Sequence, residues 1–376
     1  MKKQAIKEKL RIDIRKEYPE LFERLRGHDT SAQHRFHDGD GSNIILAFEN
    51  DVVLESWDEG KSWYAYGGNK TWPHVQRGIF RFDDELVGLN GMQLWRSYDN
   101  GCRWHGPETI PFPDDTHVRG LGMPNCFSAI KTFDGKLVLV SDNFLGQEGP
   151  AGQLISSRVS EDRGKTWTTG RLFKPADPLP NGPEGFGEPA VVEMSPGWLW
   201  MVMRTLYGEL WQCISRDGGY TWTDPTPTGL VSPIANCYAY KHPDSGAVVL
   251  SWNMTQPGLY TDFKSRHSIY RPRTNLVFAV SHDRCRTWSC PVTVEEKGGF
   301  YPTIYFSAEN MFIMYQSAGD EESQPWHKHG LTIVSYDRQE VDNLPAWTTE
   351  TIQPYIKAGL VRHWLAINCD KKESIS

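Results

Sequence analysis

Three arginines, a tyrosine, a glutamate and an aspartate lie beside strand-like runs of this sequence, and their side chains could carry out chemistry. The set comprises Arg35, Arg204, Arg273, Tyr301, Glu188 and Asp51. Arginine pairs with anions, tyrosine and carboxylates can transfer protons, and a hydrophobic core needs none of them. Each residue alone is ordinary, because a strand-end arginine is most often a solvated charge. The set becomes a candidate site only if the fold brings its members together.

A repeated phrase, Ser-x-Asp-x-Gly-x-x-Trp, predicts the fold. Copies or near copies occupy residues 56–63, 97–104, 160–167, 215–222 and 281–288, and a sixth copy without the glycine begins at Ser335. Asp followed two residues later by Gly favours a turn, because the carboxylate accepts local N–H groups and glycine takes a positive φ. Each copy follows a strand-like run, so we expect a hairpin turn that its Trp fastens to the sheet.

The spacing of the copies leaves room for four short strands and their loops between one copy and the next. A radial arrangement of such sheets leaves only short, protected edges. We therefore predict an all-β fold, a six-bladed β-propeller of four-stranded antiparallel blades over residues 29–368. Helix-like periodicity in Ala5 to Leu25 predicts a short helical extension over residues 1–28. Residues 369–376 are expected to form a frayed tail.

Either end of the chain could close the ring. Gly359 to Ile367 has the composition of a closing strand. The sequence does not decide between this segment and the N-terminal one.

The turns also predict which polar residues share a face of the propeller. The first-to-second and third-to-fourth connections of a blade lie on one face. The opposite face therefore collects the starts of first and third strands and the ends of second strands. Residues expected on that face include Arg35, Asp51, Arg77, Asp142, Glu188, Arg204, Asn253, Arg273, Tyr301 and Gln316. Their convergence from blades far apart in the sequence favours a functional site over a set of unrelated surface charges.

Composition argues against several classes of protein. The net charge is −7 and basic tracts are missing, so nucleic acid is not an expected partner. No apolar run is long enough to span a membrane, and residues 1–26 are charged where a signal peptide would be apolar, so we predict a cytoplasmic protein. Seven cysteines without a CxxC pair and 12 dispersed histidines predict reduced thiols, no metal and no cofactor.

The pattern resembles the sialidase (neuraminidase) superfamily from about Gln33 to Trp347. The resemblance is strongest in three segments: Glu188-Pro189-Ala190-Val191-Val192 with Met203-Arg204-Thr205 and the fourth copy of the phrase, Arg273-Thr274-Asn275-Leu276, and Phe300-Tyr301-Pro302-Thr303-Ile304. These segments look like the family's Glu-strand-Arg run, its third arginine and its tyrosine nucleophile.

The resemblance implies a retaining exo-glycoside hydrolase that releases a terminal sialic acid or a related acidic sugar. Tyr301 would be the nucleophile, Glu188 would take its proton, and Asp51 would be the general acid and base. Substrate binding would fall to Arg35, Arg204 and Arg273 on the carboxylate, with Asn253 and Gln316 beside them. Gln316 stands where many relatives have a glutamate that steadies an arginine.

Some roles have more than one candidate. Arg35 is followed by Phe36 and His37 where the family has other residues, which leaves Arg77 as an alternative first arginine. Asp115 and Asp142 are alternatives to Asp51.

Two other functions also fit the predicted fold. One is a lyase, in which Tyr301 or His34 removes the proton beside a uronic-acid carboxylate. The other is a non-catalytic glycan-binding propeller, because fold does not imply function. The sequence does not predict the sugar, linkage, aglycone or oligomeric state.

Overall fold

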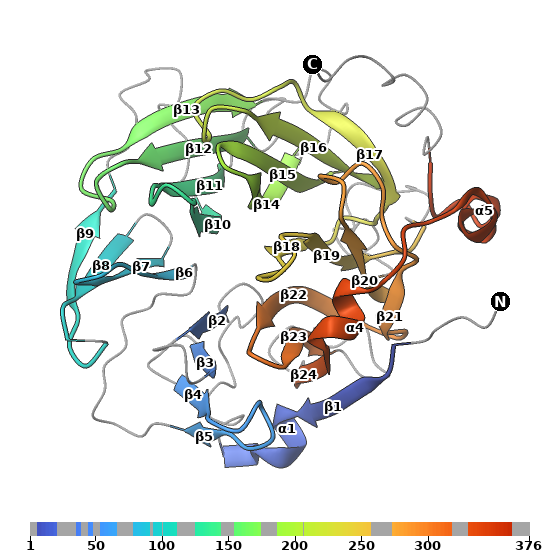
Figure 1. The fold of residues 1–376 in the computed structure, drawn as a ribbon, viewed down its shortest axis with the longest axis horizontal. Helices are drawn as coiled ribbons and strands as arrows, with labels where there is room; N and C mark the ends of the chain where they lie inside the picture. The colour runs from blue at the N-terminus through green and yellow to red at the C-terminus, as the bar shows by residue number, and fades with distance from the viewer. Residues whose placement is uncertain are drawn as a thin grey trace, which may run out of the picture.

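The protein folds into a ring of small β-sheets (Figure 1). The computed structural model describes residues 6–20, 35–38, 44–47, 53–65, 78–90, 93–99, 101–110, 125–143, 154–173, 186–205, 207–256, 273–317 and 330–362. These residues form six four-stranded sheets, and every pairing in them is antiparallel. The prediction of an all-β propeller with four-stranded antiparallel blades is confirmed.

We number the sheets along the chain. Sheet 1 contains β2 (Arg35–Asp38), β3 (Ile44–Ala47), β4 (Val53–Ser56) and β5 (Tyr64–Ala65). Sheet 2 contains β6 (Gly78–Arg81), β7 (Leu86–Asn90), β8 (Gln93–Ser97) and β9 (His105–Thr109). Sheet 3 contains β10 (Asn125–Lys131), β11 (Leu137–Asn143), β12 (Leu154–Ser160) and β13 (Thr168–Phe173).

The second half of the ring has the same organisation. Sheet 4 contains β14 (Phe186–Ser195), β15 (Trp198–Thr205), β16 (Glu209–Ser215) and β17 (Thr226–Val231). Sheet 5 contains β18 (Tyr238–Lys241), β19 (Val248–Asn253), β20 (Leu276–Ser281) and β21 (Val292–Glu295). Sheet 6 contains β22 (Gly299–Phe306), β23 (Asn310–Ser317), β24 (Gly330–Asp337) and, from the N-terminal end, β1 (Glu8–Asp13).

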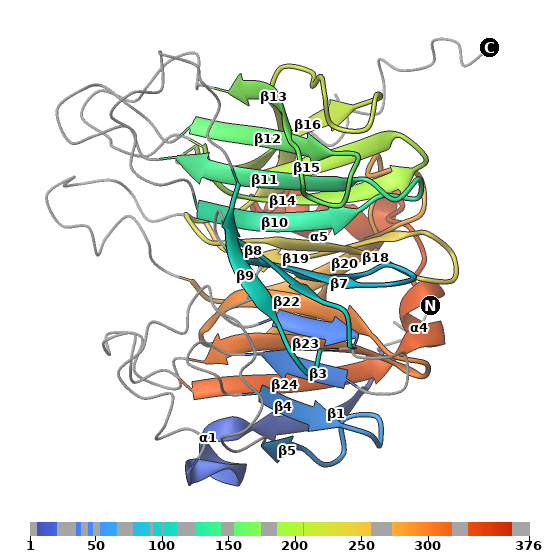
Figure 2. The ribbon, with the colours of Figure 1, turned by 90° about the vertical axis from the view of Figure 1, so that its left-hand side faces the viewer.

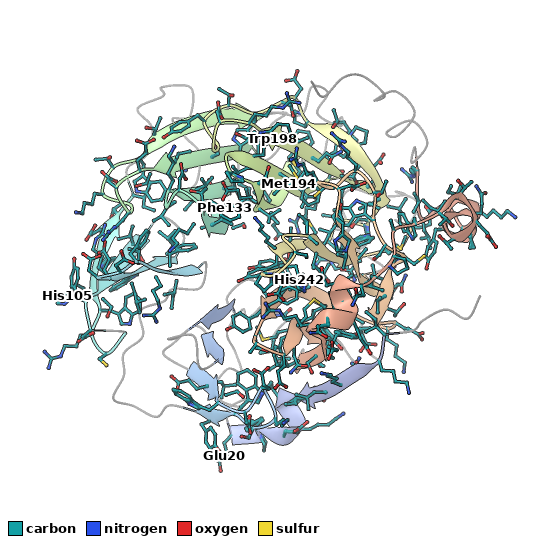
Figure 3. All side chains as sticks on the ribbon, in the orientation of Figure 1. Glu20, His105, Phe133, Met194, Trp198 and His242 are labelled. Atoms are coloured by element: carbon teal, nitrogen blue, oxygen red, sulfur yellow. The ribbon has the colours of Figure 1, made fainter. Side chains whose placement is uncertain are left out.

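The first strand of each sheet is the innermost. First strands of consecutive sheets contact one another all the way round, including β2 with β22. Figure 2 shows that the strands run across the thickness of the ring. In Figure 3, Phe133 and His242, which lie in turns after first strands, are near the ring's centre, and His105 on a fourth strand is at its rim. The ends of the first strands therefore surround the central axis.

Apolar layers between neighbouring sheets form the core. One layer joins sheets 4 and 5 through buried residues such as Trp200, Leu250 and Trp252. Others join sheet 3 to sheet 4 and sheet 5 to sheet 6. Burying apolar surface stabilises the contact between sheets by about 25 cal/mol per Å². This packing sets the positions of the strand ends.

The repeated phrase forms the turn between the third and fourth strands of sheets 1 to 5. In the fourth copy, Ser215 Oγ donates to Asp217 Oδ1 at 2.8 Å and accepts the Gly219 N–H at 2.8 Å, while Asp217 accepts the Thr221 N–H at 2.9 Å. The serine and aspartate make the same contacts in the other four copies. In the fifth copy Cys285 replaces the glycine, with a φ of 62°.

The N-terminal end of the chain closes the ring, and the prediction of a helix there is wrong over Glu8–Asp13. This segment is β1, which pairs with β24, and helix α1 covers only Ile14–Glu17. Lys9 and Arg11 are exposed while Ile12 is buried, a period of two that fits a strand. The open edge of β24 offers β1 hydrogen-bond partners, and local helical periodicity gives no sign of that edge.

The sixth copy of the phrase begins a helix and does not form a hairpin turn, which explains its missing glycine. Asp337 caps helix α4 (Arg338–Asp342) by accepting the N–H groups of Gln339 and Glu340. No hairpin is needed here, because the fourth strand of sheet 6 comes from the other end of the chain.

Helix α5 (Thr349–Lys357) follows and buries Ile352 against the layer between sheets 4 and 5. Beyond it, Val361 makes an isolated bridge to Leu230. Residues 363–367 of the predicted closing strand, and residues 369–376, lie outside the described residues. In the described part of the chain no helix combines the length and apolar character needed to cross a bilayer.

Candidate active site

Tyr301 and Glu188 are in contact although 113 residues separate them in the sequence. The Tyr301 hydroxyl donates to Glu188 Oε1 at 3.2 Å. Tyr301 is on the first strand of sheet 6 and is partly exposed, whereas Glu188 is on the first strand of sheet 4 and is buried. A phenol bonded to a carboxylate can lose its proton as it attacks an electrophile.

A bulge near the start of a first strand carries each of these two residues. The pairing register shifts between Gly187 and Ala190 and again between Phe300 and Thr303. Within the bulges φ is 44° at Glu188 and 50° at Tyr301.

The residue after each bulge residue is a proline, Pro189 or Pro302. Proline has no N–H to donate to the ladder, so regular pairing is interrupted at these points. The bulges turn both side chains out of the normal alternation along the strand.

Arg204 forms an ion pair with Glu188. Its Nη1 lies 2.6 Å from Glu188 Oε2, and both side chains are buried. Arg204 is the penultimate residue of β15, the second strand of sheet 4, and pairs with Gly187 in the register. The guanidinium therefore balances the charge of the buried carboxylate beside Tyr301.

Arg273 approaches Tyr301 from sheet 5. It precedes the third strand there and is 3% exposed. Its Nε donates to the carbonyl of Ile234 at 3.1 Å, and its Cζ lies 5.6 Å from the centroid of the Tyr301 ring. The predicted neighbours Tyr301, Glu188, Arg204 and Arg273 thus form one cluster of two guanidinium groups, one carboxylate and one phenol.

The surroundings of Tyr301 keep its hydroxyl protonated. Burial raises the pKa of Tyr301, and the Glu188 carboxylate raises it further, while Arg273 and Arg204 act in the opposite direction. The net effect is a raised pKa, so Tyr301 is a hydrogen-bond donor at neutral pH. A nearby base is needed if this oxygen is to act as a nucleophile.

Asn253 and Gln316 are both fully buried at the ends of second strands. Asn253 Nδ2 donates to the carbonyls of Gly299 at 2.8 Å and Thr274 at 3.2 Å. Its amide hydrogens are thus engaged by the backbone that leads to Tyr301 and to the third strand of sheet 5. Gln316 pairs with Phe300 in the register, one residue from Tyr301.

Several predicted site residues fall outside what the structure describes. Asp51, Arg77 and Asp115 are not among the described residues, nor is His34. Arg35 begins β2, the first strand of sheet 1, and only its backbone is described. The general acid and the first arginine therefore stay predictions.

Asp142 is described, and its side chain contacts the backbone of Glu188. Its Oδ2 accepts the Glu188 N–H at 3.2 Å, and the residue is 1% exposed. Sequence reasoning placed Asp142 on the correct face but missed this contact and both bulges. The Glu-Pro and Tyr-Pro pairs were the available signal, because a proline near a strand start marks a break in the ladder.

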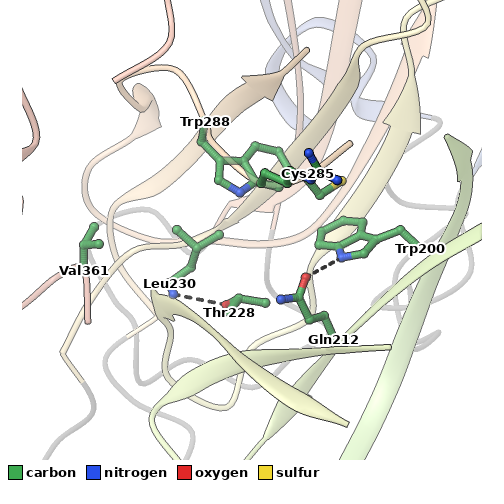
Figure 4. A pocket seen from close by; sticks show the side chains of 8 residues that line it. Trp200, Gln212, Thr228, Leu230, Cys285, Trp288 and Val361 are labelled. Carbon is green, nitrogen blue, oxygen red and sulfur yellow. Dashed lines mark hydrogen bonds between the residues drawn. The ribbon is translucent and has the colours of Figure 1, made fainter. Parts of the chain in front are cut away.

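A small pocket elsewhere contains none of these residues. It lies between sheets 4 and 5 and is lined by Trp200, Gln212, Thr228, Leu230, Cys285, Arg286, Trp288 and Val361 (Figure 4). The Trp200 indole N–H donates to Gln212 Oε1 at 2.7 Å. Cys285 and Trp288 belong to the fifth repeated phrase, so the pocket is at the turn end of the strands. Among the described residues, no three His, Cys, Asp or Glu side chains are placed to hold a metal.

The fold defines a β-propeller of four-stranded blades, and its repeated turns point to one family of such proteins. The chain belongs to the family of BNR repeat-like domains, whose profile matches residues 79–314. No curated protein matches the chain in sequence.

Solved structures with this fold include sialidases. A protein of unknown function from Dyadobacter fermentans shares 16% identity over 89% of this chain and 99% of that one, with a TM-score of 0.60. Trypanosoma rangeli sialidase, in a covalent intermediate with 2,3-difluorosialic acid, shares 16% identity over 81% of this chain and 54% of its own, with a TM-score of 0.54.

The Hadza microbial sialidase Hz136 shares 18% identity over 84% of this chain and 68% of its own, with a TM-score of 0.54. The 54% coverage of the T. rangeli sialidase means that this chain spans about half of that protein. The predicted resemblance to sialidases is confirmed, and at these identities the structural likeness is one of fold.

Proposed function

We propose that the protein is a retaining exo-glycoside hydrolase of the sialidase type, acting on a terminal sialic acid or a related acidic sugar. The observation that carries the proposal is the hydrogen bond from Tyr301 to Glu188, with Arg204 and Arg273 on either side. A structural role alone gives no reason to gather two arginines, a glutamate and a partly exposed tyrosine at one strand-end cluster.

Tyr301 would form the covalent bond to the sugar. A sialic acid carries its carboxylate on the anomeric carbon, so an Asp or Glu nucleophile would approach against like charge, and a neutral phenol avoids this repulsion. As the Tyr301 oxygen attacks, its proton passes to Glu188 Oε1. A raised tyrosine pKa makes such a transfer necessary at neutral pH.

The arginines would hold the substrate carboxylate. A guanidinium is always charged and presents a rigid fork of donors that fits a carboxylate. Arg273 lies beside the Tyr301 ring, and Arg35 would approach from sheet 1. Arg204 would serve both the substrate and Glu188.

A general acid and base would complete the reaction. Asp51 is the proposed residue, because it stands between the second and third strands of sheet 1 in the sequence. It would protonate the leaving oxygen and later remove a proton from the water that cleaves the Tyr301–sugar bond. Two displacements at the same carbon give retention of configuration.

The test is hydrolysis of a fluorogenic aryl α-sialoside by the purified protein, with Tyr301→Phe in parallel. The proposal predicts release by the wild type, the α-anomer of the sugar as the first product by NMR, and a loss of about 10³-fold or more in Tyr301→Phe. Equal rates for the two proteins would remove Tyr301 from the mechanism.

A second assay separates this function from its alternatives. A lyase would give an unsaturated sugar, detected by its ultraviolet absorbance with uronic-acid glycans, and no free reducing sialic acid. Binding of sialosides without any turnover would instead indicate a glycan-binding propeller.

Arg273→Lys tests the recognition of the acidic sugar. It keeps the charge and removes the fork, so KM for the sialoside should rise by about 10-fold or more. An unchanged KM and kcat would remove Arg273 from carboxylate binding.

A further inference from the structure

The Glu188 bulge needs support from outside its own sheet. A left-handed backbone is strained in a residue other than glycine, and a buried N–H group without an acceptor is destabilising. Glu188 has a φ of 44° and is 5% exposed. The register break takes it out of regular pairing with β15.

Asp142 of sheet 3 supplies that support. Its Oδ2 accepts the Glu188 N–H at 3.2 Å. Asp142 lies in β11, the second strand of sheet 3, and β11 contacts β14. A carboxylate that accepts a backbone N–H forms a charge-assisted hydrogen bond, which is stronger than a neutral one.

The Tyr301 bulge has the same kind of support. Asn253 ends the second strand of sheet 5 and donates to the Gly299 carbonyl, two residues before Tyr301. In both cases a buried polar side chain at the end of a second strand binds the backbone of the next sheet's first strand, at or near the residue with positive φ. The two bulges are thus held by equivalent positions in two different sheets.

We propose that Asp142 is a positioning residue, which holds the Glu188 backbone in its left-handed conformation and thereby fixes the Glu188 carboxylate against Tyr301. It acts through the Glu188 N–H and not as the general acid and base, a role for which the sequence offered it as an alternative. The inference uses the proposed function only for the roles of Tyr301 and Glu188.

The geometry leaves little room for a shift of Glu188. Its bond from Tyr301 is 3.2 Å, already long for an O–H donor. Its other oxygen is 2.6 Å from Arg204. A movement of the backbone by a fraction of an ångström would lengthen the first contact, and misplacement by about 1 Å can cost about 10²-fold in rate.

Three variants test the proposal by steady-state kinetics on the aryl sialoside. Asp142→Ala removes the acceptor, Asp142→Asn keeps an acceptor oxygen without the charge, and Asp162→Ala is a matched control in the turn at the other end of sheet 3. Asp162 accepts the Thr166 N–H at 2.8 Å and does not contact the site.

The proposal predicts that kcat falls by about 10-fold to 100-fold in Asp142→Ala with KM within about 2-fold. Asp142→Asn should recover most of that loss, and Asp162→Ala should lower the melting temperature with an unchanged kcat. Equal loss in the Ala and Asn variants would overturn the proposal, because it would indicate a proton-transfer role. An unchanged kcat in Asp142→Ala would overturn it too.

Crystal structures of the wild type and Asp142→Ala give a second readout that does not depend on activity. We expect φ of Glu188 to leave the left-handed region in Asp142→Ala and the Tyr301–Glu188 contact to be lost. If the wild type releases no sialic acid, the proposed function fails, and these structures still decide the positioning role. A Glu188 conformation that is the same in both proteins would contradict it.

Discussion

The repeated turns and the candidate active site use polar side chains in opposite ways. In a turn, serine and aspartate bond to groups at most four residues away, and the same pattern recurs five times. In the site, the partners are 113, 46 and 39 residues apart, and the first two pairs come from different sheets. The turns therefore repeat the same local contacts in each sheet and stabilise the scaffold. The site depends on contacts that do not repeat from sheet to sheet.

This difference predicts that substitutions in the site and in the turns have separable effects. Site variants should lose activity while the fold persists, and turn variants should lose stability while the activity of the folded protein persists. Variants in the site and in the turns test that separation.

Glu188→Gln should reduce kcat by about 10²-fold to 10⁴-fold, because the amide keeps the shape of the side chain and cannot take the Tyr301 proton. The measurement is kcat for the aryl sialoside, with circular dichroism to confirm folding. Because the change also leaves Arg204 without its charged partner, the melting temperature is measured alongside. A kcat within 2-fold of the wild type would show that Glu188 does not act as the base.

Gly219→Ala tests the turns. Gly219 has a φ of 101°, and an added Cβ would lie 3.1 Å from Val138 Cγ1 and 3.3 Å from Val159 Cγ2. We expect a loss of about 1–3 kcal/mol in the free energy of unfolding, from backbone strain and overpacking.

Denaturant unfolding measures this loss, and kcat of the folded variant should not change. A fall in the kcat of folded Gly219→Ala as large as that in Glu188→Gln would contradict separate effects of the turns and the site. Gly218→Ala is a matched control for backbone strain alone, because its φ is 77° and nothing lies within 4 Å of an added Cβ.

The aspartates of the turns should make stability depend on acid pH. Burial alone would raise the pKa of Asp217 and Asp162, but hydrogen bonds from the threonine and serine of each turn outweigh it and hold the pKa below its usual value. Their stabilising contribution is full above the usual aspartate pKa of about 4 and is lost as pH falls through the lower folded-state value.

The double variant Asp162→Asn, Asp217→Asn should therefore show a flatter fall of the unfolding free energy below pH 4 than the wild type. The measurement is urea unfolding from pH 2 to 6. Parallel curves for the two proteins would show that these carboxylates do not supply the acid dependence.

The smallest expected effect is at alkaline pH and concerns the site. The raised pKa of Tyr301 means that the protein is stabilised below the usual tyrosine pKa of about 10, and this contribution is lost as pH rises toward the folded-state value. Tyr301→Phe lacks the titrating hydroxyl. Its free energy of unfolding should therefore fall less than that of the wild type as pH rises above 10. A difference that does not vary with pH would show that Tyr301 titrates normally.

The sequence predicted the scaffold well because the turns depend on local chemistry. Ser215, Asp217 and Gly219 lie within one turn, and their contacts can be deduced from spacing alone. The strand β1 was missed for the opposite reason: its partner, β24, is more than 300 residues away, and only its edge makes a strand of Glu8–Asp13.

The site could be predicted in part. Glu188, Arg204, Arg273 and Tyr301 could be placed on one face, because strand ends follow from the turns. Their mutual contacts depend on the two bulges and on packing between sheets, which have no local signature beyond Pro189 and Pro302. The role of Asp142 could not be predicted, because its partner is a backbone N–H that only the bulge makes available.

The most direct test of the central claim, that Tyr301 is the nucleophile of a retaining glycosidase, is to trap the covalent intermediate. The wild type is incubated with 2,3-difluorosialic acid and its peptides are analysed by mass spectrometry, alongside Tyr301→Phe and a turnover assay. We predict a fluorosialyl adduct on the peptide that contains Tyr301, and none in the variant. Turnover of the aryl sialoside with an adduct on another residue, or with the adduct retained in Tyr301→Phe, would contradict the account.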